Sequence, residues 1–272
     1  MDLGIAGRKA IVCASSKGLG RACAEKLAEA ECEVVVNGRD RDSAEATAAD
    51  IRKATGAKVI AVAADVASPD GQAALFAVCP EPDILVTNNL GPPPRDYHDV
   101  TRQNILDGVV GSMVTPIELI QRAIDAMVAK KFGRVVNITS GGVYMPQVNL
   151  EVSCGARAGL TAFLTTVARA VAQHNVTINF LLPGAFETDR LRAIFDTAAK
   201  RDNTTPASGA LATGGQHPCQ AGGQARGIRR SLRVSMFRPR RFHHRPQSAD
   251  RRRGIPGCLR VTGACSQRAG AA

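Results

Sequence analysis

The first 206 residues predict an α/β domain with a doubly wound parallel sheet, because strand-like and helix-like segments alternate along them. Six short apolar runs have the length and composition of buried strands, and segments with helical spacing alternate with them. A glycine-containing turn joins the first run to the first helix. With 272 residues, 44% of them hydrophobic, the chain has the length of one large α/β domain or two small ones and enough apolar residues to bury a core.

The first half of this domain supplies four of the expected strands. These are Lys9–Cys13, Glu33–Asn37, Lys58–Ala64 and Asp83–Thr87. A helix is expected from Gly18 to Ala30, because apolar residues recur there on one helical stripe. The stripe consists of Leu19, Ala22, Cys23, Leu27 and Ala30. A polar helix is expected from Ser43 to about Thr55.

The second half continues the alternation. A long helix is expected from about Gln103 to Ala129, and Pro116 should interrupt and kink it, because proline cannot donate the backbone hydrogen bond. The remaining segments are a strand at Gly133–Thr139, a helix at Ser153–Gln173 and a sixth strand at Val176–Leu182.

Membrane and secreted proteins are disfavoured by the sequence. No apolar run approaches the roughly 20 residues of a membrane helix, and the first residues lack a signal-peptide pattern. The eight Cys include no Cys-x-x-Cys pair, and several fall inside apolar runs. We therefore expect buried, reduced thiols in a cytoplasmic protein, with neither a metal site nor a disulfide framework.

The positive charge is confined to the end of the chain. Residues 1–200 contain 21 basic and 22 acidic residues, whereas residues 201–272 contain 14 Arg, no Lys and two Asp. Residues 207–272 also lack strand or helix periodicity, so they are expected to form a separate, disordered segment. One interpretation of this segment is a nucleic-acid arm that contacts phosphates through its Arg pairs.

The turn after the first strand is the first candidate site. It contains Ala14, Ser15, Ser16, Lys17, Gly18, Leu19 and Gly20. Between a strand and a helix, such a turn can bind a dinucleotide pyrophosphate through backbone N–H groups and the positive end of the helix. The two glycines allow close backbone approach, and the two serines offer hydroxyls.

The end of the second strand bears on the choice of dinucleotide. It is Asn37-Gly38-Arg39, which has no acidic residue to bind a ribose 2′-hydroxyl. Lys17 and Arg39 instead offer cations to a 2′-phosphate, which favours NADP(H) over NAD(H). The alternative is that both are solvated surface cations.

With these features the domain resembles the short-chain dehydrogenase/reductase family, most closely its 3-oxoacyl-[acyl-carrier-protein] reductase branch, which has a Rossmann fold. Further matching landmarks are Asp65-Val66, Asn88, Asn137-Ile-Thr-Ser140 and the segment from Pro183 to Thr188. The resemblance implies an adenine contact at Asp65 and Val66 and a nicotinamide loop after the sixth strand. The remaining implied cofactor contacts are Ala14 to Gly20, Arg39, Asn88, Arg157, Pro183, Gly184, Phe186 and Thr188.

The chain departs from the family pattern at several functional positions. The family's first glycine is Ala14, a change that we expect to be tolerated if its φ is negative. Of the family's Asn–Ser–Tyr–Lys set only the serine, Ser140, is present. The other three positions align with Ser112, Ser153 and Arg157.

These replacements remove the family's proton donor. A serine hydroxyl lacks the acidity of the tyrosine, and arginine stays protonated in proteins. Arg157 can still bind ribose hydroxyls, and Ser140 can still polarise a carbonyl. Tyr144, four residues after Ser140, is a candidate substitute acid; the alternative is a packing role in its loop. The candidate catalytic residues are therefore Ser140, Tyr144, Ser153 and Arg157, with no metal.

The resemblance implies an NADP(H)-dependent oxidoreductase that reduces a ketone or oxidises a secondary alcohol. Its substrate would be a small carbonyl or alcohol compound, or one linked to acyl carrier protein. The alternative is a catalytically weak or inactive NADP(H)-binding protein that acts as a sensor or partner subunit. A homo-oligomer is expected if the C-terminal segment is intact.

The composition of residues 207–272 has a second explanation. Arg without Lys, beside Gly, Pro and Ala, is typical of GC-rich codons read out of frame. Synonymous codons for residues 214–254, read one base later, permit a segment resembling the family's last helix and last strand. We therefore favour a frameshift that begins between about Pro206 and Gly214, which would remove the seventh strand, and we disfavour nucleic-acid binding.

Overall fold

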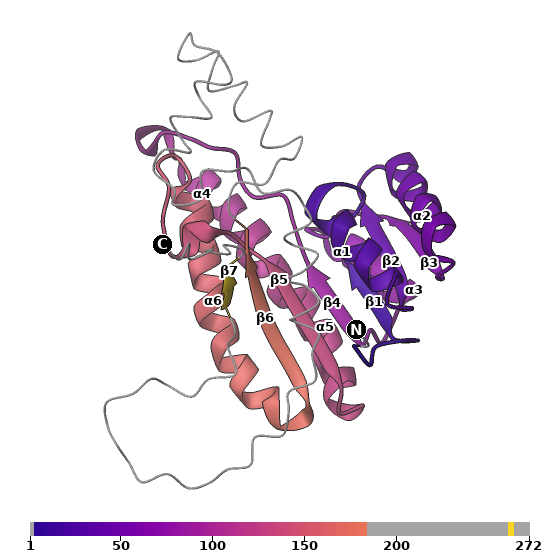
Figure 1. Cartoon of the computed structure of the whole chain (residues 1–272). Coiled ribbons are helices and arrows are strands. Elements are labelled where there is room, and N and C mark those ends of the chain that lie inside the picture. The colour runs from indigo at the N-terminus through magenta and orange to yellow at the C-terminus, as the bar shows by residue number, and fades with distance from the viewer. Residues whose placement is uncertain (1–2, 184–260, 264–272) are drawn as a thin grey trace, which may run out of the picture.

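The computed structural model describes residues 3–183 and 261–263, and these form a parallel sheet with helices on both faces (Figure 1). The strands follow the order β3-β2-β1-β4-β5-β6-β7, so the order reverses between β1 and β4. The strands are β1 (Lys9–Val12), β2 (Glu33–Gly38), β3 (Val59–Ala63), β4 (Ile84–Thr87), β5 (Gly133–Ile138), β6 (Val176–Leu182) and β7 (Val261–Gly263). The predicted fold class and all six predicted strands are confirmed.

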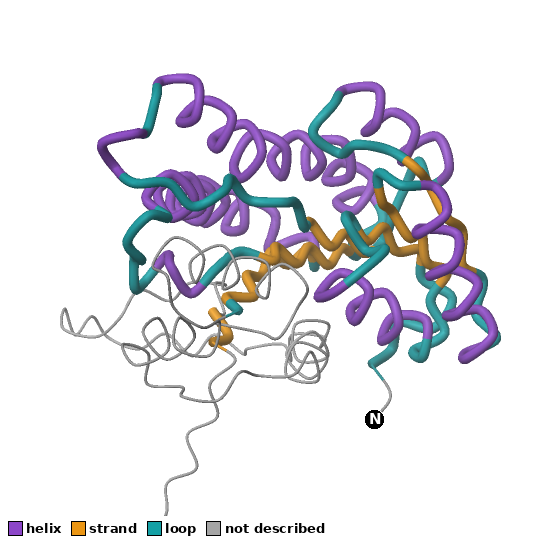
Figure 2. Tube along the Cα trace, turned by 90° about the horizontal axis from the view of Figure 1, so that it is seen from above, coloured by secondary structure: helices purple, strands orange, loops and turns teal. Residues whose placement is uncertain are grey.

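Six α-helices lie in the described part of the chain. They are α1 (Gly18–Ala28), α2 (Arg41–Thr55), α3 (Pro69–Val78), α4 (Arg102–Val109), α5 (Thr115–Ala129) and α6 (Glu151–Val171). Viewed from above, they lie on both sides of the sheet (Figure 2).

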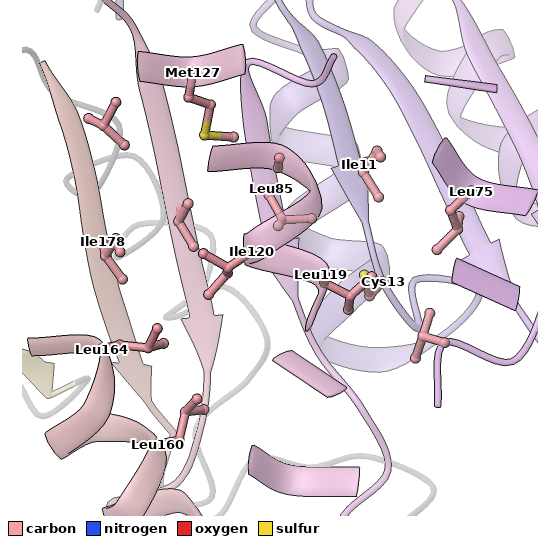
Figure 3. Packing of buried hydrophobic residues seen from close by; sticks show 14 of the residues in the cluster. Ile11, Cys13, Leu75, Leu85, Leu119, Ile120, Met127, Leu160, Leu164 and Ile178 are labelled. Carbon is pink, nitrogen blue, oxygen red and sulfur yellow. The ribbon is translucent and has the colours of Figure 1, made fainter. Parts of the chain in front are cut away.

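Two apolar clusters show which helices cover which face. On one face, α1 and α2 place residues such as Cys23, Leu27 and Ile51 against the strands. On the other face, α3, α5 and α6 pack through residues such as Leu75, Leu119 and Leu164 (Figure 3). This three-layer packing fixes the carboxyl ends of the strands, where the candidate site lies.

The helix α3 was not predicted from the sequence. Its only buried residues are Gly71, Gln72 and Leu75, so it carries no apolar stripe that periodicity could detect. Its start nevertheless follows ordinary capping chemistry. The Ser68 hydroxyl accepts the Gly71 N–H, and Pro69 opens the first turn.

The predicted long helix is interrupted, but before Pro116 rather than at it. Residues Val110–Val114 form a π-turn between α4 and α5, in which the Thr115 N–H bonds to the Val110 carbonyl. Pro116 then lies in the first turn of α5, where a missing N–H costs little. The π-turn places Ser112, which is buried, between the two helices.

The last strand corrects an expectation. The sequence predicted no strand after residue 206 and an exposed edge at β6. Instead, β7 pairs in parallel with β6, with Val261 opposite Phe180 and Gly263 opposite Leu182. Two β-branched residues suit a pleated strand, and the edge of β6 has free backbone groups to receive them. The rest of 207–272 lies outside the described residues.

The cysteines within the described ranges agree with the prediction of buried, reduced thiols. All five are free and buried: Cys13, Cys23, Cys32, Cys79 and Cys154. Burial raises the pKa of Cys13, Cys23 and Cys32 to about 12, so these thiols stay protonated at neutral pH. No helix in the described part of the chain is long and apolar enough to cross a membrane.

Candidate functional site

In the turn between β1 and α1, the backbone of Gly20 lies close to the backbone of Ala14. A Cβ on Gly20 would lie 2.4 Å from the Ala14 carbonyl oxygen, so only glycine fits there. Gly18 has a φ of +58°. The condition under which we expected Ala14 to be tolerated is not met, since its φ is +44°. The turn holds this alanine in the left-handed conformation through an Asn37 Oδ1 bond to its N–H at 2.9 Å.

The two serines of this turn have different surroundings. Ser15 is fully buried, and its hydroxyl donates to the Val12 carbonyl at 2.6 Å and accepts the Asn37 N–H at 2.9 Å. Its own N–H bonds to the Asn37 carbonyl. We expected a hydroxyl offered to a pyrophosphate, and the geometry instead gives Ser15 a role in joining β1 to β2. Ser16 is half-buried.

The N-terminus of α1 has the features of an anion site. The capping position is Lys17, which is exposed and makes no side-chain capping bond. The helices α2, α3 and α4 are capped by the side chains of Asp40, Ser68 and Thr101, whereas α5 and α6 lack a side-chain cap as α1 does. The first N–H groups of α1 therefore face no protein side-chain cap, as a bound phosphate requires. The close backbone approach at Gly20 and this open helix end fit a dinucleotide.

Arg39 adds a second cation at the neighbouring strand end. It directly follows β2 and is exposed. A Cβ on Gly38 would lie 2.8 Å from the Ser16 hydroxyl, so the end of β2 packs directly against the turn before α1. Both predicted cations thus belong to segments that meet at the carboxyl ends of the strands.

A buried amide that the sequence reasoning missed organises these strand ends. Asn37 Nδ2 donates to the carbonyls of Val62 and Ala64 at 3.2 and 2.9 Å, while its Oδ1 accepts the Ala14 N–H. Asn88 Nδ2 donates to the other side of the turn, at the Ala14 carbonyl, at 3.2 Å. The ends of four strands are therefore joined by two amides.

The predicted adenine contact lies in the loop after β3. Asp65 is exposed, and Val66 is buried with 3% of its surface exposed. Asp65 Oδ1 accepts the Ala67 N–H at 3.0 Å, and its carbonyl accepts the Ser68 hydroxyl at 2.9 Å. These bonds give the loop a fixed shape in which the carboxylate remains at the surface.

The residues aligned with the family's tyrosine and lysine do meet. Both lie on α6, where the Arg157 guanidinium donates to the Ser153 hydroxyl. The guanidinium also lies against Gly91, because a Cβ there would be 2.9 Å from Nη1 and 3.0 Å from Nη2. Arg157 therefore connects α6 with the proline-rich loop after β4.

Ser140 follows β5 and lies near α6. Its hydroxyl accepts the Gly142 N–H at 3.1 Å. A Cβ on Gly142 would lie 3.3 Å from this hydroxyl and 2.7 Å from Cys154 Sγ, so the residue after Ser153 packs close to Ser140. The Gly141 N–H bonds to the Pro183 carbonyl at 3.0 Å, which brings the end of β6 to the same place.

A small cavity of about 20 Å³, with both polar and apolar lining, lies between these elements. Its lining includes Asn88, Ser112, Thr115, Thr139 and Arg157. The hydroxyls of Ser112 and Thr115 are buried and have no hydrogen-bond partner among the described residues. The π-turn thus brings two hydroxyls beside the arginine, and a cavity of this size holds about one water molecule.

The other predicted residues are not brought into this cavity. Tyr144 ends a short 3₁₀ turn after Ser140, and 62% of its surface is exposed. The predicted nicotinamide contacts Gly184, Phe186 and Thr188 lie outside the described residues.

Comparison with known proteins identifies the family. A model described as short chain dehydrogenase matches residues 8–199. The chain is 32% identical over 200 residues to the 3-oxoacyl-[acyl-carrier-protein] reductase FabG of Escherichia coli (strain K12), covering 70% of this chain and 78% of that protein. It is 29% identical over 201 residues to the NADPH-dependent reductase BacG of Bacillus subtilis (strain 168), covering 72% and 78%.

Solved structures of other proteins have the same fold. YwfH, described as an NADPH-dependent reductase involved in bacilysin biosynthesis, superposes with a TM-score of 0.78 at 26% identity, covering 85% of this chain and 91% of that one. The L-sorbose reductase of Gluconobacter frateurii shares the fold, with a TM-score of 0.80 at 22% identity over 87% and 92% of the two chains. The match over residues 8–199, on a parallel sheet whose order reverses between β1 and β4, shows that this chain belongs to the short-chain dehydrogenase family.

Proposed function

We propose that this enzyme is an NADP(H)-dependent oxidoreductase that reduces a ketone or oxidises the corresponding secondary alcohol. The observation that carries the proposal is the uncapped N-terminus of α1, flanked by the exposed Lys17 and Arg39 at the end of the sheet that also holds Ser140 and Arg157. The NADPH-dependent relatives support the same choice of cofactor. We place the enzyme in the cytoplasm, where its thiols would stay reduced.

The chain's own residues would bind and polarise the substrate. When bound, NADPH supplies the hydride. Ser153 accepts a hydrogen bond from Arg157, so its own hydrogen remains available for a carbonyl oxygen. Ser140 likewise accepts from Gly142, so its hydroxyl hydrogen is also available to donate to a carbonyl oxygen. Neither hydroxyl is acidic enough to give up its proton readily, so water or Tyr144 has to supply it.

The family's tyrosine and lysine are thus replaced by a serine and an arginine, and we infer slow turnover. The alternative is a catalytically inactive NADP(H)-binding protein. A 3-oxoacyl-[acyl-carrier-protein] substrate is the finer proposal, and it is supported by the relatives that carry this activity.

Two measurements separate these functions. NADPH binding followed by calorimetry should show a complex in either case. Turnover of a panel of ketones, including a 3-oxoacyl thioester, should then show NADPH oxidation for an enzyme. Binding without oxidation of any ketone would favour the sensor, and absence of NADPH binding would exclude both.

We also propose that residues after about Pro206 derive from a frameshift. The support is the Arg-rich, Lys-free composition and the family-like segment that a one-base shift permits. The nucleotide sequence across codons 205–255 tests this directly. Codons that do not encode the family-like segment in the shifted frame would leave the written residues as the real ones.

Self-association is proposed through an apolar stripe on α4 and the π-turn. We define the stripe as Leu106, Val110 and Val114, which recur every fourth residue and are 45%, 44% and 36% exposed. Replacing Val110 with Asp should convert an oligomer to a monomer in sedimentation experiments, because a charge would replace apolar contact area. Val78→Asp, at a similarly exposed apolar position on α3, should leave the assembly intact. A monomeric parent protein would contradict the proposal.

A further inference from the structure

We infer that Gln72 positions the loop after β3, which contains Asp65 and Val66 and would contact the adenine base. Through this loop, Gln72 sets the enzyme's preference for adenine over other purines. The inference rests on the proposed function and on the adenine contact that the family resemblance implies at Asp65 and Val66. Gln72 lies on α3, which the sequence did not predict, and it is itself 1% exposed. It does not reach the surface where a cofactor binds, so its role is indirect.

Both the Nε2 donor and the Oε1 acceptor of the Gln72 amide make hydrogen bonds. Nε2 donates to the Val66 carbonyl at 3.2 Å and to Glu118 Oε2 at 2.8 Å. Oε1 accepts the Arg122 Nε–H at 3.2 Å. The amide thus connects the adenine loop to two side chains of α5, a helix that lies far away in the sequence.

Hydrogen bonds and close packing join the loop to the start of α3. Ser68 bonds to both the Asp65 carbonyl and the Gly71 N–H. A Cβ on Gly71 would lie 1.9 Å from the Asp65 carbonyl oxygen, so the loop sits directly on α3. Since the loop is joined to the start of α3 in this way, its position depends on how both are attached to the rest of the domain.

The loop has polar attachments on both sides. Before Asp65, at the end of β3, Ala64 donates to the Gly38 carbonyl at 2.9 Å and accepts from Asn37 Nδ2. Gln72 holds Val66, after Asp65, and anchors it to Glu118. Losing the Gln72 attachment would let Asp65 shift while β3 stayed in place. A carboxylate recognises the adenine amino group only within hydrogen-bond distance, so a small shift removes the recognition.

The decisive probe is deamino-NADPH, in which hypoxanthine replaces adenine and an oxygen replaces the amino group. The parent enzyme should bind NADPH about tenfold more tightly than deamino-NADPH, as one charge-assisted hydrogen bond provides. In Gln72→Met, which keeps the length of the side chain but loses the amide, this ratio should fall to about two or less. Calorimetric titration of the full chain measures both affinities without turnover.

Matched variants separate positioning from general destabilisation. Glu118→Gln keeps an acceptor for Gln72 and should retain the parent ratio, whereas Glu118→Leu should lower it. Gln103→Met removes an exposed amide that donates to Asp107 at 2.7 Å and should leave the ratio unchanged. If Gln72→Met does not fold, the two Glu118 variants carry the test, because Glu118 is only half-buried.

Three results would overturn the inference. The first is that the ratio of the affinities for NADPH and deamino-NADPH is the same in Gln72→Met as in the parent, or in Glu118→Leu if Gln72→Met does not fold. Another is an equal loss of affinity for both nucleotides, which would indicate a merely structural role. The third is a parent that binds both nucleotides equally, which would leave the proposed cofactor intact. A parent that binds neither nucleotide would instead refute the proposed function itself.

Discussion

Replacing Ser153 with Tyr together with Arg157 with Lys is expected to raise the rate of ketone reduction by an order of magnitude or more. General acid catalysis contributes ~10²–10⁴-fold, and the present residues offer no side chain with a suitable pKa at this position. The pair already meets on α6, one turn apart, so the new side chains would start from adjacent positions. Steady-state NADPH oxidation with the best ketone of the panel measures the gain.

The single variants are the controls for this gain. Ser153→Tyr alone should gain less, because Arg157 lies against Gly91 rather than being free to act as the family's lysine does. A folded double variant that binds NADPH with no faster turnover would show that the site uses another donor. Tyr144→Phe would then test the exposed tyrosine directly.

Arg39→Asp is expected to reverse the cofactor preference from NADPH to NADH. One charge-assisted hydrogen bond to a 2′-phosphate contributes about 1–3 kcal/mol, and an aspartate repels that phosphate while accepting a bond from a 2′-hydroxyl. The ratio of kcat/KM for the two cofactors should therefore change by roughly 10- to 100-fold or more. Binding titrations give the same ratio if turnover is slow.

Lys53→Asp provides a charge-matched control, since this exposed lysine lies in the last turn of α2, away from the end of β2. It should leave the preference unchanged. Equal affinity of the parent enzyme for NADPH and NADH would remove the basis for the role given to Arg39.

The strands could be predicted from the sequence because each is a short, mainly apolar run, even where, as in β3, part of the run is exposed. The glycine turn could be located for a similar reason, since it follows the first run directly. The helix α3 could not, because only Leu75 among its apolar residues is buried with the core. The feature of the sequence that did indicate this helix was its capping pattern, with Ser68 and Pro69 at its start.

The side-chain network of the site was harder to predict. Asn37 and Gln72 act through bonds to backbone carbonyls and to side chains on distant elements, and Gln72 and Glu118 are 46 residues apart. Neither position carries a motif that indicates such partners. The buried Ser15 shows the opposite error, because a serine in a phosphate-binding turn suggests a ligand contact when its hydroxyl is in fact bonded within the fold.

Because of the π-turn at Val110–Val114, the number of residues between α4 and α5 affects the geometry of the site. A π-turn contains one residue more than the α-helical turn that it replaces. Deleting Gly111 would therefore give a continuous α-helix whose two ends keep their phase, with Gly108 still against Val152 and Leu119 still in the core. The residues between them would change orientation, and the bond from Asn89 Nδ2 to the Gly111 carbonyl would be lost. An indel in this helix would thus redirect the pocket hydroxyls without substituting any side chain that lines the pocket.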